Sequence, residues 1–224
     1  SGKKLAGFTR EQVMEGADLA TRTYSKGGFD LDSSEAQLMT EYAENGWSVK
    51  PFFSKREHSG LFLSKIDPVT KKAQIKIVYH GTDKGYHWAT NLNAAKKDAS
   101  WLPSEYEGAP VYAHAGFVNG VDASWDVLNT YVVSELYNCY QKGIRRDDVS
   151  FEVVGHSMGA ANATLAAMRL IQGELHIKNT NVSVMTFESP RVFNPAGAHA
   201  YEALLGERTL RVGNKHDIVT HVGP

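Results

Sequence analysis

The residues best suited to chemistry form a short cluster around one serine. Gly155-His156-Ser157-Met158-Gly159 fits the pattern G-x-S-x-G, in which a serine stands on a sharp turn between a strand and a helix. Side chains two residues before and after that serine would collide with neighbouring backbone, so glycine is needed at both positions. The cluster predicts that Ser157 is a nucleophile.

The surroundings of the cluster make the pattern specific. The apolar segment 150–154 precedes it directly and is expected to be a strand, and the alanine-rich segment 158–171 follows directly and is expected to be a helix. The start of a helix favours developing negative charge, so the backbone N–H of Met158 is the expected first oxyanion donor.

A serine nucleophile needs a base, and the base needs an orienting carboxylate. Asp217 fits the carboxylate, since it follows the strand predicted at 208–212 and a Gly213-Asn214 turn. Glu202 and Glu207 are competitors, but a helix face and a turn tip place them less well.

The base is harder to assign, because in this order of elements a histidine should follow the acid. The chain ends at Pro224, and only His221 lies after Asp217. His216 precedes the acid and breaks the order. Three further histidines are interpreted as structural: His80, His114 and His156. Of these, His156 is expected to pack beside the sheet.

Composition restricts the class of protein. The 224 residues carry a formal net charge of −1, which provides no basic field for nucleic acid. No clustered Cys/His pattern suggests a metal, and no cofactor motif is present. No stretch is apolar over the length of a membrane span, and the first residues lack the apolar core of a signal peptide. Cys139 is the only cysteine, expected to be a buried, inert thiol, and a reducing compartment fits.

The predicted elements alternate between strands and helices. Thr9 with Gln12 predicts a capping box, and Phe8 with Val13 a hydrophobic staple. Helices are expected at 8–24, 35–44, 118–141, 158–171 and 197–205, and strands at 60–66, 73–80, 150–154, 181–187 and 208–212. Such alternation predicts an α/β fold in which helices cover both faces of a mostly parallel sheet. Residues 82–112 lack periodicity and are expected to form a long loop with one short helix.

From residue 73 to 223 the chain resembles the class 3 lipase family, which includes the fungal triacylglycerol lipases. The resemblance rests on ordered blocks: Ile77 to Thr82, Val111 to Phe117, the Gly155–Gly159 cluster, Thr186 to Val192, and Arg211 to Val219. It implies an α/β-hydrolase fold as one domain over 1–224. Residues 1–60 show no such match and are interpreted as an N-terminal helical and strand extension.

The resemblance also implies roles for single residues. Thr82 would be the second oxyanion donor, and 83–103 would be a lid. Trp88 and Trp101 within it either meet a lipid surface or anchor the loop in the core. Transient contact with a membrane surface through this lid is therefore expected.

The chain departs from the family pattern at three positions. Glu188 and Phe193 replace small residues, usually glycine at 188, and His80 replaces a usual arginine. Glu188 should lie near the site after a central strand, where it would alter the pocket or its charge.

The expected function is hydrolysis of carboxylic esters of lipids (triacylglycerol, diacylglycerol or phospholipid) through an acyl-enzyme on Ser157. The alternative is a hydrolase-fold binding module, or pseudoenzyme, that lacks the catalytic histidine. The family's histidine follows the acid by several dozen residues. The preferred expectation is therefore that the fold is truncated at the C-terminus, that the base lies beyond Pro224, and that the 224-residue chain alone is nearly inactive.

Overall fold

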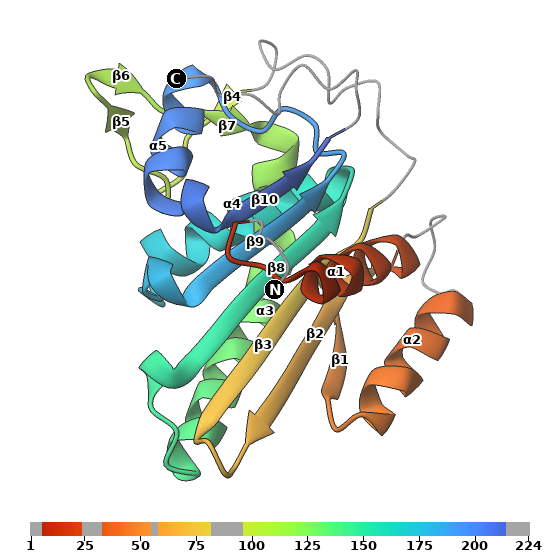
Figure 1. Ribbon diagram of the computed structural model, residues 1–224. Helices are drawn as coiled ribbons and strands as arrows, with labels where there is room; N and C mark the ends of the chain where they lie inside the picture. The colour runs from red at the N-terminus through yellow and green to blue at the C-terminus, as the bar shows by residue number, and fades with distance from the viewer. Residues whose placement is uncertain (1–5, 24–32, 55–57, 82–95, 214–224) are drawn as a thin grey trace.

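The computed structural model describes residues 6–23, 33–54, 58–81 and 96–213. Within these residues a six-stranded sheet runs through the molecule in the order β1-β2-β3-β8-β9-β10 (Figure 1). Its strands are β1 (Ser48–Phe53), β2 (His58–Asp67), β3 (Lys72–Tyr79), β8 (Val149–His156), β9 (Val182–Phe187) and β10 (Thr209–Val212). Strands β3, β8, β9 and β10 are parallel to one another, and β2 is antiparallel to both of its neighbours.

Helices cover both faces of the sheet, as the alternating elements predict. In Figure 1, α1 and α2 lie in front of the sheet and α3 lies behind it. The helices are α1 (Arg10–Arg22), α2 (Ser33–Glu44), α3 (Ala115–Gln141), α4 (Met158–Gln172) and α5 (Pro195–Leu205), with short 3₁₀ helices η1 (Arg146–Asp148), η2 (Asn179–Asn181) and η3 (Gly206–Arg208). The predicted mostly parallel α/β arrangement is confirmed.

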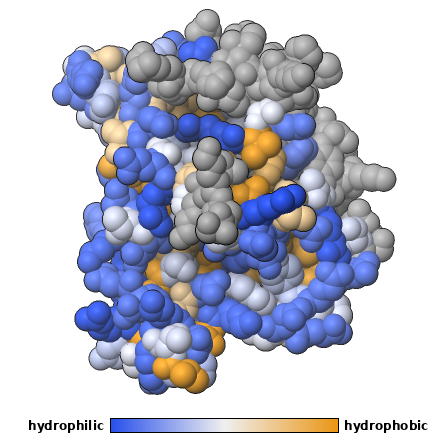
Figure 2. Space-filling model, viewed as in Figure 1, coloured by the Kyte–Doolittle hydropathy of each residue, from blue (hydrophilic) through white to orange (hydrophobic). Residues whose placement is uncertain are grey.

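Side chains alternate between two separate apolar cores, because successive residues of a strand point to opposite faces. In β3, Ile75, Ile77 and Tyr79 join the core beneath α3, α4 and α5, whereas Val78 joins the core beneath α1 and α2. The second core is smaller. Figure 2 shows that the outer surface on this side of the molecule is mostly hydrophilic.

The face beneath α1 also contains buried charge. Lys76 of β3 lies 3.5 Å from Glu15 of α1 and 4.0 Å from Glu152 of β8, and its Nζ lies 5.2 Å from the ring centre of Trp47. Burial raises the pKa of Glu152, and the Lys76 charge opposes that rise. The N-terminal extension is therefore joined to the sheet by polar as well as apolar contacts.

The start of the chain folds as its sequence predicts. The Thr9 hydroxyl accepts from the Gln12 N–H, and the Gln12 side chain accepts from the Thr9 N–H, which completes the capping box of α1. Strand β1 was not expected from the sequence. Its Lys50 and Pro51 interrupt any apolar alternation, and the strand lies at the edge of the sheet, where proline is tolerated.

The described part of the long loop is more ordered than expected. Residues 96–112 contain no helix. They contribute to two small antiparallel pairs: β4 (Lys96–Lys97) with β7 (Ala113–His114), and β5 (Glu105–Tyr106) with β6 (Ala109–Pro110). Helix α3 then begins three residues earlier than predicted. His114 caps it, because its Nδ1 accepts from the N–H of Gly116.

Two further expectations concern burial and membrane spans. Cys139 is buried in α3, and burial raises its pKa to about 11, as expected for an inert thiol. Among the described helices, none combines the length and hydropathy that crossing a membrane requires.

Candidate functional site

The carboxyl ends of four parallel strands meet at one edge of the sheet. The register pairs Tyr79 with Gly155, His156 with Phe187, and Phe187 with Val212. Segments far apart in the sequence therefore end side by side: the His80-Gly81 end of β3, the turn at Ser157, the turn at Glu188 and the end of β10. This is the edge at which ligands of open α/β sheets bind.

Ser157 lies on the turn between β8 and α4 in a backbone conformation that residues with a side chain rarely adopt. Its φ is 58° and its ψ is −122°, and the residue is 2% exposed. The Ser157 N–H donates to the carbonyl of Phe187 at 2.8 Å, which fixes the turn to β9. A strained nucleophile turn is what the G-x-S-x-G pattern predicts.

The two glycines that flank Ser157 are required by close backbone approach. A Cβ at Gly155 would overlap the carbonyl group of Gly159. A Cβ at Gly159 would lie 2.6 Å from the carbonyl oxygen of Tyr79 and 2.7 Å from that of His80. The predicted reason for glycine at both positions is confirmed, since backbone atoms rather than movable side chains fill the space.

The first turn of α4 packs tightly against the sheet. Gly159, Ala160, Ala161 and Ala163 are all buried. Met158 occupies the first position of the helix, where backbone N–H groups have no partner within the helix itself. Its N–H therefore belongs to the group that can stabilise an anion next to Ser157.

His80, at the end of β3, is joined to the N-terminal extension. Its Nε2 lies 2.8 Å from Oε1 of Glu35 in α2, and the two side chains are only 4% and 3% exposed. The His80 N–H donates to Ser59 of β2, and the His80 carbonyl is one of the groups that face Gly159. The pair therefore holds the end of β3 against the turn that carries Ser157.

A second histidine and glutamate pair lies directly beside Ser157. His156 Nε2 is 3.1 Å from Oε2 of Glu188, and their side chains are 21% and 47% exposed. Glu188 has a φ of 52°, and its N–H donates to the carbonyl of Val212 at 2.8 Å. The backbone at 187–188 is thus held by β8 on one side and by β10 on the other.

Several predicted site residues lie outside the described residues: Thr82, Trp88, His216, Asp217 and His221. Their predicted roles stay predictions. Strand β10, which precedes Asp217 in the chain, ends beside Phe187. Of the competing acids, Glu202 pairs with Arg211 at 3.1 Å, and Glu207 lies in η3 before β10, at the opposite edge.

The structure distinguishes the two interpretations of Trp101. This side chain is buried, and the Arg169 guanidinium lies 5.4 Å from its ring centre and 4.5 Å from that of Trp125. Trp101 is therefore a core anchor here rather than a residue that faces a lipid surface. Residues 96–103 of the expected lid are likewise held to the body, because Lys96 and Lys97 pair with β7.

The sequence indicated the structural role of His114 but not the pairing of two histidines with Glu35 and Glu188. His114 is buried as a helix cap, as expected of a structural histidine. His156 does not simply pack beside the sheet, since it pairs with Glu188. Glu35 went unnoticed because the N-terminal extension has no matching motif. The register of parallel strands is the signal that would have placed Glu188 next to His156.

The described residues contain no group of three or more His, Cys, Asp or Glu side chains arranged to hold a metal ion. The described part of the edge offers a serine, two histidines, two carboxylates and the start of a helix.

Comparisons with known sequences agree with this geometry. A family model described as Lipase (class 3) matches residues 76–224. A lipase from Rhizopus niveus is 29% identical over 231 residues, covering 100% of this chain and 53% of its own length. Phospholipase A1-II 1 from Oryza sativa subsp. indica is 26% identical, covering 95% of this chain and 56% of its own length. The chain therefore spans about half the length of these relatives.

Solved structures share the fold. Lipase II from Rhizopus niveus superposes with a TM-score of 0.64 at 25% identity, over 97% of this chain and 77% of that one. A triacylglycerol lipase described as having a serine protease triad as its catalytic centre superposes with a TM-score of 0.64 at 21% identity, over 97% of this chain and 76% of that one. Because the family model covers well over half of the sequence and the fold agrees, the chain belongs to the class 3 lipase family and has an α/β-hydrolase fold.

Proposed function

We propose that this protein hydrolyses carboxylic esters of lipids through a covalent acyl-enzyme on Ser157. One observation carries the proposal: Ser157 is held in a strained turn at the carboxyl edge, with glycine at 155 and 159 packed against backbone. The names of its relatives, lipase and phospholipase A1, support an ester of glycerol as substrate.

In the proposed reaction the Ser157 hydroxyl attacks the ester carbonyl carbon, and its proton passes to a base. The developing oxyanion accepts hydrogen bonds from the N–H of Met158 and from Thr82. The base returns the proton to the leaving alcohol. Water then attacks the acyl-enzyme, so that the fatty acid leaves and Ser157 regains its proton.

We assign the orienting carboxylate to Asp217 and the base to a histidine that follows it. That base is His221 or a histidine beyond Pro224. Among the described histidines, His156 lies against Glu188. His80 and His114 are engaged by Glu35 and by the start of α3, which leaves them poorly suited to the role.

A fluorophosphonate probe and an emulsified diacylglycerol test the proposal together. We expect stoichiometric labelling of Ser157 and release of fatty acid by the protein that its natural reading frame encodes, and neither with Ser157→Ala. Repeating both assays with the 224-residue chain and with His221→Ala locates the base. Retained folding without labelling or hydrolysis in the natural protein would support a hydrolase-fold binding module instead.

We further propose transient contact with a lipid surface through residues 83–103, with Trp88 as the apolar contact. A neighbouring structure, a fungal lipase bound to an inhibitor, is described as a model for interfacial activation. Hydrolysis of a short-chain ester should rise sharply above its critical micelle concentration, and Trp88→Ser should reduce that rise. An unchanged rise in Trp88→Ser would argue against this contact.

A further inference from the structure

Glu188 lies in the turn next to the one that carries Ser157, and its carboxylate is half-exposed. Glu188 follows Phe187, whose carbonyl accepts the N–H of Ser157 at 2.8 Å, and its side chain meets His156, the residue before Ser157. Neighbouring strands are about 4.8 Å apart, so the turn of Glu188 lies beside the turn at which an ester would be bound. A carboxylate at this edge attracts a positively charged substrate and repels a negatively charged one.

The backbone at Glu188 favours glycine, yet a glutamate is present. A φ of 52° is costly for a residue with a Cβ, and the hydrogen bonds of 187 and 188 to β8 and β10 hold the backbone there. Strained residues of this kind gather at functional sites, where the surrounding structure maintains them. The observed strain thus points to a role for the side chain.

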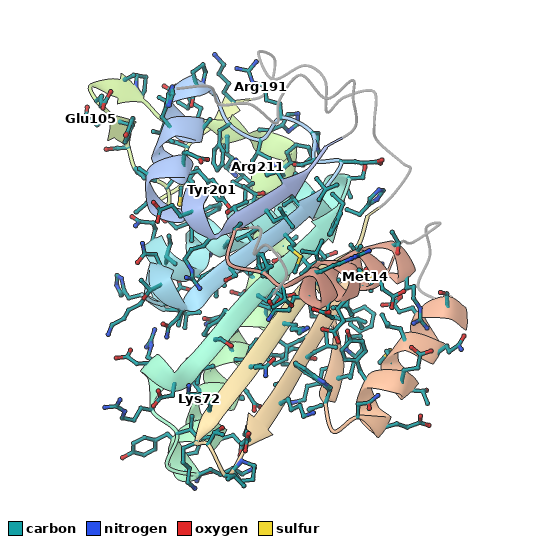
Figure 3. The ribbon with its side chains drawn as sticks, viewed as in Figure 1. Met14, Lys72, Glu105, Arg191, Tyr201 and Arg211 are labelled. Atoms are coloured by element: carbon teal, nitrogen blue, oxygen red, sulfur yellow. The ribbon has the colours of Figure 1, made fainter. Side chains whose placement is uncertain are left out.

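The charge of this carboxylate is not cancelled by an arginine among the described residues. Arg191 donates to the carbonyl of Phe193, and Arg211 pairs with Glu202 while lying 5.3 Å from the ring centre of Tyr201 (Figure 3). His156 is the partner of Glu188 at 3.1 Å. The carboxylate of Glu188 is the more exposed member of this pair, since its side chain is 47% exposed and that of His156 is 21% exposed.

We propose that Glu188, oriented by His156, determines which esters the site accepts: it favours neutral acylglycerols and disfavours esters whose alcohol part carries a phosphate. The proposal rests on the proposed function of Ser157. Two negative charges at this spacing repel each other, but the half-exposed carboxylate is partly screened by water. The expected discrimination is therefore about two- to fivefold rather than a complete exclusion.

Matched lipids in neutral detergent micelles test this directly. We would measure kcat/KM for diacylglycerol and for phosphatidate with the same acyl chains. Glu188→Gln keeps the size of the side chain and removes the charge, and Glu188→Gly also relieves the backbone. Both should raise the ratio of phosphatidate to diacylglycerol hydrolysis about two- to fivefold. Glu207→Gln, an equal charge change at the opposite edge, should leave the ratio unchanged.

Salt supplies an independent readout that a merely structural role would not move. Raising the ionic strength should increase the ratio for wild-type protein and have little effect in Glu188→Gln, because the screened charge is absent there. A ratio that neither Glu188 variant changes, or that Glu207→Gln changes equally, overturns the inference.

The same assay separates this inference from the proposed function. Diacylglycerol hydrolysis that Ser157→Ala abolishes supports the role of Ser157, so an unchanged ratio then overturns the role of Glu188 alone. Absence of diacylglycerol hydrolysis and of Ser157 labelling in wild-type protein overturns both.

Discussion

Two neighbouring turns at the carboxyl edge reach similar backbone strain by different means. The turn after β8 holds Ser157 at φ 58° between two glycines packed on backbone. The turn after β9 holds Glu188 at φ 52° with no glycine beside it, and it is held by backbone hydrogen bonds to Ser157 and Val212 and by the pair with His156. The backbone at Ser157 is fixed by close packing of its flanking glycines, whereas the backbone at Glu188 is held by hydrogen bonds to neighbouring segments. Substitutions should therefore be tolerated far better at Glu188.

The largest effect is expected at the hydroxyl of Ser157. Ser157→Ala should lower kcat/KM for ester hydrolysis by at least about a thousandfold, because the acyl-enzyme cannot form. Ser157→Gly should be equally inactive, yet about 1 kcal/mol more stable than Ser157→Ala, since glycine accepts this backbone. Activity assays and urea unfolding of both variants measure the two effects. Equal stability of the two would remove the argument for strain at this turn.

Packing at the first turn should make its glycine hard to replace. Gly155→Ala should lower the free energy of unfolding by about 3 kcal/mol, because the new Cβ overlaps the backbone of Gly159. Gly108→Ala is the matched control. Its φ is also positive, at 81°, but no atom lies within 4 Å of the added Cβ. It should cost only about 1 kcal/mol of backbone strain. Similar losses in the two variants, measured by urea unfolding, would contradict the packing explanation.

The buried pair of His80 and Glu35 should support the turn that carries Ser157, because it holds the end of β3 next to Gly159. Glu35→Ala should lower the free energy of unfolding by about 2 kcal/mol, because it removes a buried hydrogen-bond partner. It should also slow labelling of Ser157, since the end of β3 contacts Gly159. Glu44→Ala, an exposed position of the same helix, should have little effect. If Glu35→Ala lowers the free energy of unfolding but leaves the rate of Ser157 labelling unchanged, the pair only stabilises the fold.

The smallest effect is expected at the second turn, the one that holds Glu188. It is a gain in stability over wild type. Glu188→Gly should raise the free energy of unfolding by about 1 kcal/mol, because glycine adopts a positive φ without steric cost. Glu188→Ala removes the same carboxylate but keeps the strain, so it should show no such gain. Thermal or urea unfolding of the three proteins compares them. A gain in the alanine variant would mean that charge rather than backbone strain limits stability here.

Local pattern was sufficient to predict most of this fold. The capping box at Thr9, the strand and helix around Ser157 and the strand at β3 depend on neighbours in sequence, and all are present in the structure. Edge strand β1 was missed because Pro51 breaks the apolar alternation, and its place depends on pairing with β2. The paired strands in 96–112 were missed because each is only two residues long.

The sequence by itself determined the nucleophile turn, since glycine at 155 and 159 with a serine between a strand and a helix leaves one conformation. It also marked Glu188 as unusual. Only the tertiary structure decided which groups face each other: His80 with Glu35, His156 with Glu188, and Trp101 with Arg169. Those contacts join segments far apart in the chain, and they follow from strand order and register, which no local pattern encodes.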